Sequence, residues 1–171
     1  CSIEAAKFLH SGHLLDESFI LNNAIDLERF QPNTVRRNEV RRKLGIGENY
    51  VFGHVGRFEA EKNHRLLLEI FHRIHRSQPN ARLILVGVGS LIDQVRGQAH
   101  MLGLDESVLF LGPRSDVPDL MDAMDTFLFP SLYEGLGIVA IEAQAMGLPV
   151  IASESIPKAT AVTSLITYLP L

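Results

Sequence analysis

From Tyr50 onward, short apolar runs alternate with segments that have helical periodicity. YVFGHVG (50–56) and ARLILVG (81–87) are almost continuously apolar, as expected of parallel strands that are covered on both faces. The segment between them, His64–Ser77, carries its large apolar residues on one helical stripe. This alternation predicts an α/β fold with a doubly wound, Rossmann-like parallel sheet and right-handed crossovers.

The remaining elements follow the same alternation. The other predicted strands are Val108–Leu111, Thr126–Phe129, Val150–Ala152 and Ile166–Leu169, and there is a short extended run at Phe19–Asn22. The other predicted helices are residues 1–14, Asn33–Leu44, Leu91–Leu102, Val117–Met124 and a segment that starts near Gly137 and stops at Gly147. Because ligands of such folds bind at the carboxyl ends of the strands, candidate site residues are sought there.

Composition excludes several classes of protein. A formal charge of -4 argues against general nucleic-acid binding, whose footprint is usually basic. Cys1 is the single cysteine, so an internal disulfide and a cysteine-based metal site are excluded. No apolar run approaches the roughly 18 residues that a membrane-spanning helix needs. The chain begins with Cys rather than Met and ends just after a predicted strand at Leu171, so we expect a segment of a longer protein.

The predicted helix Asn33–Leu44 is rich in cations. They are Arg36, Arg37, Arg41, Arg42 and Lys43. Basic residues near the carboxyl end of a helix usually form a solvated face that complements the helix dipole. The alternative is contact with a phosphate or an anionic membrane surface.

Two cations follow the first strand of the alternation. Arg57 and Lys62 both lie in the loop after Gly56. A guanidinium fork and an ammonium can neutralise the charge that develops on a diphosphate leaving group without a metal. The alternative is that both cations pair on the surface with Glu59 and Glu61.

LVGVGS (85–90) forms a glycine-rich turn after the next strand. It supplies Gly87 and Gly89, but Ile92 stands where a dinucleotide-binding motif has its third glycine. The acidic residue that such a motif needs is also missing, so an NAD-dependent enzyme ranks last. The turn is either a tight connection or a backbone contact for a nucleotide base or ribose.

The stretch FPSLYEGLGIVAIEAQAMGLPV (129–150) reads as strand, turn, helix and strand, the unit that offers a helix amino terminus to an anion. It contains two carboxylates, Glu134 before the helix and Glu142 on it. With Ile141 and Ala145 on the buried side, Glu142 is expected at the boundary between the core and a cleft, where it could accept hydrogen bonds from ribose hydroxyls. Two glutamates at this spacing are otherwise often simply solvated.

Other chemistry is not indicated. The histidines lack the H-E-x-x-H spacing of a metal site, and neither a G-x-S-x-G nucleophile elbow nor an Asp-x-Asp motif is present. Asp116 with Asp119, and Asp122 with Asp125, are better explained as helix-capping and surface residues. We therefore predict no metal site.

Taken together, these segments resemble the family-4 retaining glycosyltransferases (group 1). PSLYEGLGIVAIEAQAMGLPVIAS is similar to the signature segment of that family, including its E-x7-E pair, Glu134 and Glu142. GRFEAEKN (56–63) resembles the G-R-x-x-x-x-K-N segment, LILVGVG (83–89) the glycine turn, and FLGPRSDVPDLMDAMDTFLFPS (110–131) the segment before the signature. NNAIDLERF (22–30) is similar to the hinge, with Ala24 in place of the usual glycine. RSDVP and SESIPK are closest to exopolysaccharide or capsule-type members.

The resemblance implies a role for each matching residue. Arg57 and Lys62 would contact the donor diphosphate, and Glu142 would bind the ribose hydroxyls. Glu134, with the backbone of Gly135, Leu136 and Gly137, would hold the transferred sugar. Gly87 and Gly89 would belong to the donor-binding surface. The catalytic candidates are thus Glu134, Arg57 and Lys62.

The resemblance also implies an architecture and a reaction. Residues 1–30 would be the end of an N-terminal domain and the linker, and residues 31–171 the donor-binding domain, the C-terminal half of a GT-B fold. The implied reaction is metal-independent transfer, with retention, from a nucleotide sugar of the UDP type. The acceptor, a glycan or a lipid-linked saccharide, would bind through the other domain.

The full-length protein would then be cytoplasmic, with a peripheral contact to the inner face of the membrane. Two alternatives remain at this point. One is a sugar-nucleotide epimerase of the same architecture. The other is a non-enzymatic nucleotide-binding module.

Overall fold

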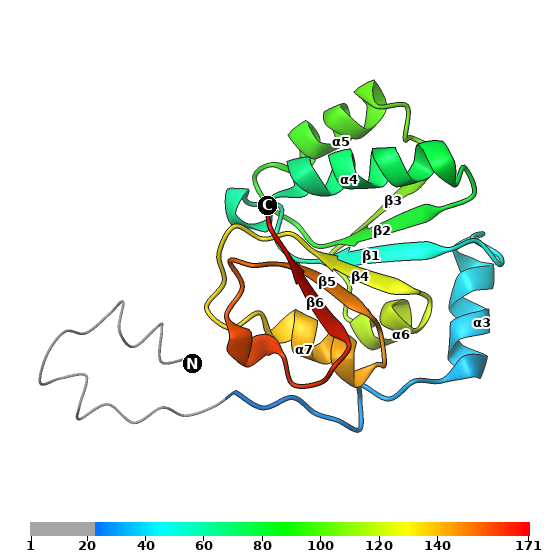
Figure 1. Ribbon diagram of the computed structural model, residues 1–171. Helices are drawn as coiled ribbons and strands as arrows, with labels where there is room; N and C mark the ends of the chain where they lie inside the picture. The colour runs from blue at the N-terminus through cyan, green and yellow to red at the C-terminus, as the bar shows by residue number, and fades with distance from the viewer. Residues whose placement is uncertain (1–22) are drawn as a thin grey trace, which may run out of the picture.

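The computed structural model describes residues 23–171 of the chain, and these form a three-layer α/β structure (Figure 1). Its centre is a six-stranded sheet in the order β3-β2-β1-β4-β5-β6. Every pair of neighbouring strands is parallel. The strands are β1 Val51–Val55, β2 Arg82–Val86, β3 Val108–Gly112, β4 Thr126–Phe129, β5 Val150–Ser153 and β6 Ile166–Leu169. This is the strand order of a doubly wound Rossmann-type sheet, so the predicted fold class is confirmed.

The helices also lie where the sequence places them. They are α3 Thr34–Lys43, α4 His64–Ser77, α5 Ile92–Met101, α6 Val117–Asp122 and α7 Ile138–Ala145. Two short 3-10 turns, η1 Ala60–Lys62 and η2 Lys158–Thr160, were not predicted. The helix predicted for residues 1–14 and the extended run Phe19–Asn22 lie outside the described residues.

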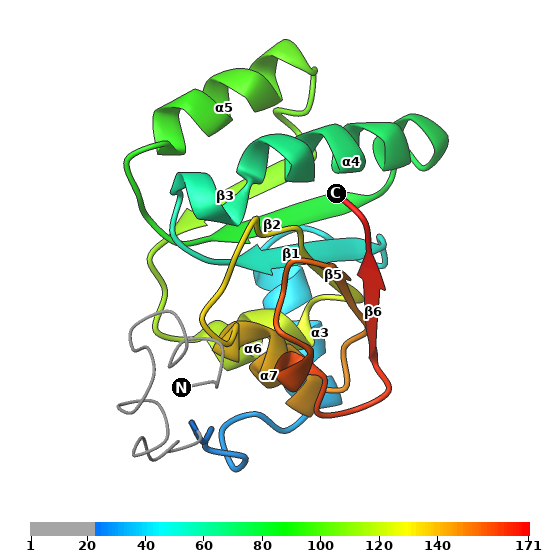
Figure 2. The ribbon, with the colours of Figure 1, turned by 60° about the vertical axis from the view of Figure 1, so that its left-hand side comes forward.

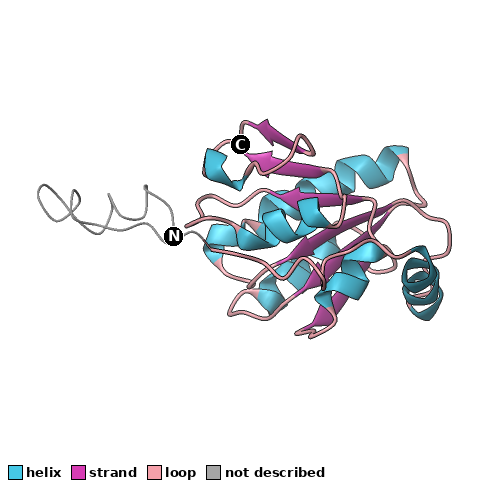
Figure 3. Ribbon diagram, turned by 90° about the horizontal axis from the view of Figure 1, so that it is seen from below, coloured by secondary structure: helices cyan, strands magenta, loops and turns pink. Residues whose placement is uncertain are grey.

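Alternate side chains of the strands build a separate core on each face of the sheet. Phe52, Leu83 and Leu85 pack beneath α4 and α5. Val51 and Ile84 point to the other face, which α6 and α7 cover (Figures 1 and 3). Burial on both faces explains why these strands read as continuous apolar runs.

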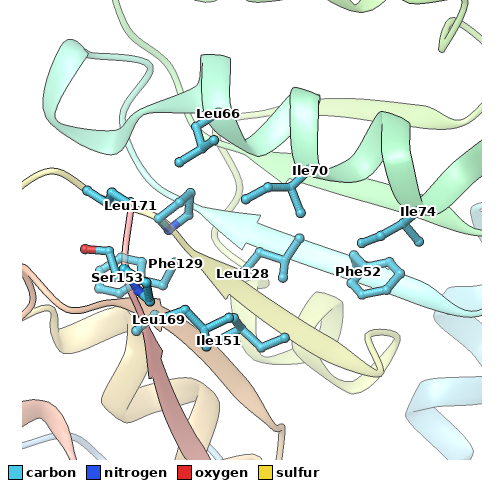
Figure 4. A pocket seen from close by; sticks show the side chains of 13 residues that line it. Phe52, Leu66, Ile70, Ile74, Leu128, Phe129, Ile151, Ser153, Leu169 and Leu171 are labelled. Atoms are coloured by element: carbon cyan, nitrogen blue, oxygen red, sulfur yellow. The ribbon is translucent and has the colours of Figure 1, made fainter.

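One end of the α4 face remains open to solvent. Between α4 and β6 lies an apolar groove of about 220 Å³ (Figure 4). Leu66 and Ile70 line it from α4, while Ile151 and Leu169 line it from the sheet and are 37% and 48% exposed. The described helices therefore cover this face less completely than the opposite one.

The cationic helix α3 is fixed to the amino ends of β1 and β4. Asn33 caps it by accepting a hydrogen bond from the amide of Arg36 at 3.0 Å. Arg41 is buried and donates to the carbonyl oxygens of Gly47 (2.8 Å) and Ala123 (2.7 Å). Its Nη1 lies 3.4 Å from Asp125.

The two neighbouring arginines complete this network. Arg36 pairs with Asp122, and Arg37 donates to Asp125 Oδ1 at 2.6 Å. Asp125 in turn accepts from the amide of Val51 at 2.7 Å. Arg36, Arg37 and Arg41 therefore stabilise the fold, which corrects the prediction of a solvated face for these three. Arg42 and Lys43 are exposed, as that prediction expects.

The aspartates Asp116 and Asp122 also differ from the prediction that they cap a helix or lie on the surface. Asp122, expected on the surface, is 7% exposed because it accepts from the Asn33 amide and pairs with Arg36. Asp116 precedes α6, but its carboxylate makes no cap bond and is instead held by Arg114, at 2.7 and 2.5 Å. Partners that are distant in sequence, on α3, decide the position of Asp122.

Replacing Asp125 should test the importance of this network. Asp125→Ala leaves the buried Arg41 guanidinium without its charged partner, so we expect the free energy of unfolding to fall by about 3 kcal/mol. Urea unfolding measures this change. Glu39→Ala removes an exposed carboxylate from α3 and should change the free energy by less than about 0.5 kcal/mol. Equal stabilities for the two variants would contradict the structural role of the network.

Candidate functional site

The loops that follow β1, β2, β3 and β4 meet at the carboxyl edge of the sheet. This edge lies opposite α3, and the turned view of Figure 2 brings it forward. The order of the sheet places β1 beside β4, although their sequences are far apart. The change of winding direction between these two strands is where doubly wound folds bind ligands.

An ion pair joins the loop after β1 to the loop after β4. Lys62 Nζ lies 2.5 Å from Glu134 Oε1, and the two side chains are only 13% and 12% exposed. The backbone supports the contact, because the Leu132 amide donates to the Glu61 carbonyl at 2.8 Å. Lys62 also lies over the ring of Phe129, 5.5 Å from its centroid. The structure thus brings together two of the predicted catalytic residues.

Arg57 lies in the same loop but is less constrained. Its side chain is 73% exposed, and Nη2 is 3.1 Å from Glu61 Oε1. The surface pairing considered from the sequence therefore holds for Arg57 but not for Lys62. Such an exposed pair is worth little, so the guanidinium can turn toward an anion at small cost.

Gly87 and Gly89 allow the β1 and β2 loops to touch. A Cβ on Gly87 would lie 2.0 Å from the Gly56 carbonyl oxygen, and one on Gly89 would lie 2.4 Å from that of Phe58. Glu59 strengthens this contact by accepting from the amide (2.9 Å) and hydroxyl (2.7 Å) of Ser90, which lowers the pKa of Glu59. Close backbone packing explains both glycines without a ligand.

The EGLG turn leads from Glu134 into α7. Gly137 has φ 74°, and a Cβ there would lie 2.9 Å from the Phe129 ring. Thr160 donates its hydroxyl to the Leu136 carbonyl, which ties the turn to η2. Gly135, which lies between Glu134 and Leu136, is exposed. The turn therefore has a fixed path from the ion pair to the helix.

Glu142 lies in a cleft of about 490 Å³ beside this turn. Gly56, Ile138 and Arg114 line the same cleft. Glu142 is half-buried, and burial raises the pKa of its carboxyl group, although the charge of Arg29 acts in the opposite direction. A carboxylate at the wall of a cleft can accept hydrogen bonds from ligand hydroxyls.

The orientation of α7 differs in detail from the prediction. Its buried residues are Ala140, Ala143 and Gln144, whereas Ile141 and Ala145 are only partly buried. The small alanines permit close packing on the sheet. Gln144 donates from Nε2 to the Thr160 carbonyl at 2.8 Å, so a buried amide, which no periodicity reveals, helps to fix the helix. Glu142 still reaches the cleft.

Sequence reasoning missed two arginines of this cleft. Arg114 and Ser115 follow β3 directly, so the rule of examining strand ends could have identified them. Arg29 lines the cleft from the segment before α3, which the motif match assigns to the hinge and not to the donor site.

Two histidines that were not singled out lie beneath the ion pair. His54 and His64 are fully or almost fully buried, with ring centroids 4.9 Å apart. His54 Nδ1 lies 2.9 Å from the Leu128 carbonyl oxygen. Burial lowers the pKa of His54 to about 3, and burial, helped by the charge of Lys62, lowers that of His64 to about 4. Both rings are therefore neutral beside Lys62.

Metal ligands do not gather in the part of the chain that the structure describes. Among residues 23–171, no three His, Cys, Asp or Glu side chains are placed to hold a metal ion together. Over the same residues, no helix has the length and apolar character needed to cross a membrane.

The sequence as a whole matches a known family. The family model described as "Glycosyl transferases group 1" matches residues 36–164, which include Arg57, Lys62, Glu134 and Glu142. This chain belongs to the group 1 glycosyltransferases. The resemblance predicted from the motifs is thereby confirmed.

Two relatives of this glycosyltransferase chain show how far the likeness extends. EpsF of Bacillus subtilis is 38% identical over 175 residues, which cover 100% of this chain and 46% of EpsF. The UDP-Gal:alpha-D-GlcNAc-diphosphoundecaprenol alpha-1,3-galactosyltransferase of Escherichia coli is 34% identical over 78% of this chain and 36% of its own length. The glycosyltransferase chain thus spans less than half of these relatives.

Among solved structures, the chain is similar to Anabaena Alr3699/HepE in complex with UDP-glucose. That likeness has a TM-score of 0.79 and 28% identity, over 91% of this chain and 44% of HepE. The described sheet and helices therefore share the fold of the matching part of HepE, in agreement with the predicted fold class.

The buried histidines of this glycosyltransferase domain should make its stability depend on pH. The unfolded chain takes up protons near the ordinary pKa of 6.5, but the folded chain does so only near 3 and 4. The unfolded state thus holds more protons between these values. The free energy of unfolding should fall as the pH drops from 6.5 toward 4, by up to about 1.4 kcal/mol per pH unit for each histidine.

Urea unfolding between pH 4 and 7.5 measures this dependence. His64→Leu removes one of the two groups and should give a flatter curve. His100→Gln replaces an exposed histidine and should keep the steep curve, because His54 and His64 remain. A His64→Leu curve parallel to the wild-type curve would show that His64 is not held neutral.

Proposed function

We propose that this chain is the donor-binding part of a retaining, metal-independent glycosyltransferase. The full protein would move a sugar from a nucleotide sugar to an acceptor hydroxyl. The observation that carries the proposal is the ion pair between Lys62 and Glu134 beside the cleft of Glu142. It places the cationic loop and the E-x7-E segment at one edge of the sheet, where doubly wound folds bind ligands.

Each candidate residue would contact a different part of the donor. Arg57 and Lys62 would neutralise the diphosphate as the sugar leaves, which supports a reaction without a metal. Lys62 pairs with Glu134, so an incoming diphosphate would compete with this carboxylate for the Lys62 ammonium. Glu134 would then be available to the transferred sugar, near the backbone of Gly135, Leu136 and Gly137.

Glu142 would accept hydrogen bonds from the ribose hydroxyls. Its place on the wall of the cleft, half-buried and on a helix that is packed firmly on the sheet, supports this role. Gly87 and Gly89 would bring the backbone of their turn close to the nucleotide, in addition to the packing role described above.

A UDP sugar is the donor that we favour. The similar HepE structure contains UDP-glucose, and the name of the Escherichia coli relative specifies a UDP-galactose donor and a lipid-linked acceptor. By analogy, the acceptor of the full protein would be a glycan or a lipid-linked saccharide. The reaction would serve exopolysaccharide or capsule synthesis in the cytoplasm, at the inner face of the membrane.

The similarity to known proteins favours sugar transfer over epimerisation. The family description and the name of the galactosyltransferase both specify transfer. The family description likewise favours an enzyme over a non-enzymatic binding module.

Nucleotide binding provides the direct test of the proposal. A ligand that binds only the folded chain raises its melting temperature, so scanning calorimetry with UDP-glucose, GDP-mannose and ADP-glucose should identify the donor class. We expect the largest increase with UDP-glucose. No increase with any of the three at millimolar concentration would refute the proposed donor site.

Replacing Glu142 tests its assignment to the ribose. Glu142→Ala should weaken UDP-glucose binding by roughly 1.5–3 kcal/mol, the range for hydrogen bonds to a charged group. Titration calorimetry measures the affinity. Glu39→Ala, on the far side of the domain, serves as the matched control and should bind like the wild type. Wild-type affinity in Glu142→Ala would remove Glu142 from the site.

A further inference from the structure

The segment before α3 forms one wall of the Glu142 cleft. Arg29 and Phe30 line this cleft together with Glu142. The resemblance to the family implies that these two residues would belong to the linker, which would join the donor-binding domain to the rest of the protein. A linker residue thus lies in the cleft that is proposed to hold the donor.

The backbone around Arg29 is held on both sides. Phe30 is 7% exposed and packs in the core beneath α6 and α7. Before Arg29, Asp26 forms a turn by accepting from the amides of Glu28 (Oδ1, 3.0 Å) and Arg29 (carbonyl oxygen, 3.1 Å). After it, the amide of Asn33 donates to the buried Asp122 at 3.0 Å. The backbone of Arg29 is therefore held at the cleft, although the residue is exposed to solvent.

The charges that face Glu142 come from different elements. Arg114 lies at the β3 side of the cleft. Its guanidinium donates two short hydrogen bonds to the carboxylate of Asp116 and is therefore already paired. α7 itself carries no charged residue other than Glu142. In the adjoining loops, Lys62 and Glu134 neutralise each other. Arg29 is the cation that acts on Glu142, where it opposes the rise in pKa caused by burial.

We propose that Arg29 is a supporting residue of the donor site, which acts by its charge from the same cleft wall to keep the Glu142 carboxylate ionised. The inference rests on the proposed function. An ionised carboxylate offers only acceptor oxygens to ribose hydroxyls, whereas protonation turns one of these oxygens into a donor. If Arg29 is part of the linker, as the resemblance implies, donor affinity depends on where the linker lies. By reciprocity, a bound donor holds the linker in place.

The pH dependence of donor binding distinguishes this role from a structural one. UDP-glucose is a suitable probe because its diphosphate diester does not titrate between pH 5 and pH 8. In Arg29→Ala, Glu142 should become protonated at a higher pH than in the wild type. The affinity of Arg29→Ala should therefore fall below that of the wild type by roughly two- to fivefold near pH 5, and by less at pH 7. Titration calorimetry across this range measures both profiles.

Three matched variants isolate the effect. Arg29→Lys keeps the positive charge and should restore the wild-type profile. Arg42→Ala removes an exposed arginine from α3, away from the cleft, and should also follow the wild type. In a Glu142→Gln background, Arg29→Ala should add no further pH dependence. Identical profiles for wild type and Arg29→Ala would overturn the proposal.

A titration without ligand separates this inference from the proposed function. Carbon-13 NMR of the Glu142 carboxyl group should show a higher pKa in Arg29→Ala than in the wild type. If the pKa of Glu142 is unchanged but UDP-glucose binds, the role of Arg29 is overturned and the proposed function stands. Failure of the wild-type chain to bind any nucleotide sugar would overturn the proposed function, and with it the donor role of Arg29, whatever the NMR titration showed.

Discussion

The candidate site depends on the adjacency of β1 and β4 in the sheet. These strands are far apart in sequence, yet the Rossmann-type order makes them neighbours and directs their following loops to the same edge. The ion pair of Lys62 with Glu134 is a consequence of this order. If either strand were shifted in register, the two charges would separate and each would remain in a largely buried position without its partner.

The sequence predicts the fold well because its signals are local. Each buried strand and amphipathic helix is encoded in a few consecutive residues, as β2 and α4 show. The glycine turns and the two cations of the β1 loop could be placed by the rule that ligands meet strand ends. The edge that carries Lys62, Glu134 and Glu142 was therefore predictable.

The remaining details depend on contacts between distant residues. Nothing near Arg41 in the sequence indicates that Asp125 will be its partner, so its burial could not be foreseen. Gln144 presents the same difficulty, because two of its partners, the Thr160 carbonyl and Thr163, lie beyond α7 in the sequence. The proximity of Arg29 to Glu142 likewise arises from the path of the chain before α3.

The groove between α4 and β6 has a practical consequence for work on this chain in solution. Ile151 and Leu169 present apolar surface to water at the open end of the sheet. Exposed apolar patches of this kind attract amphiphilic molecules and other apolar surfaces. A dye whose fluorescence increases in apolar surroundings would thus already be bright on the folded chain. Its signal would rise less on melting than it does for a protein without such an open apolar groove.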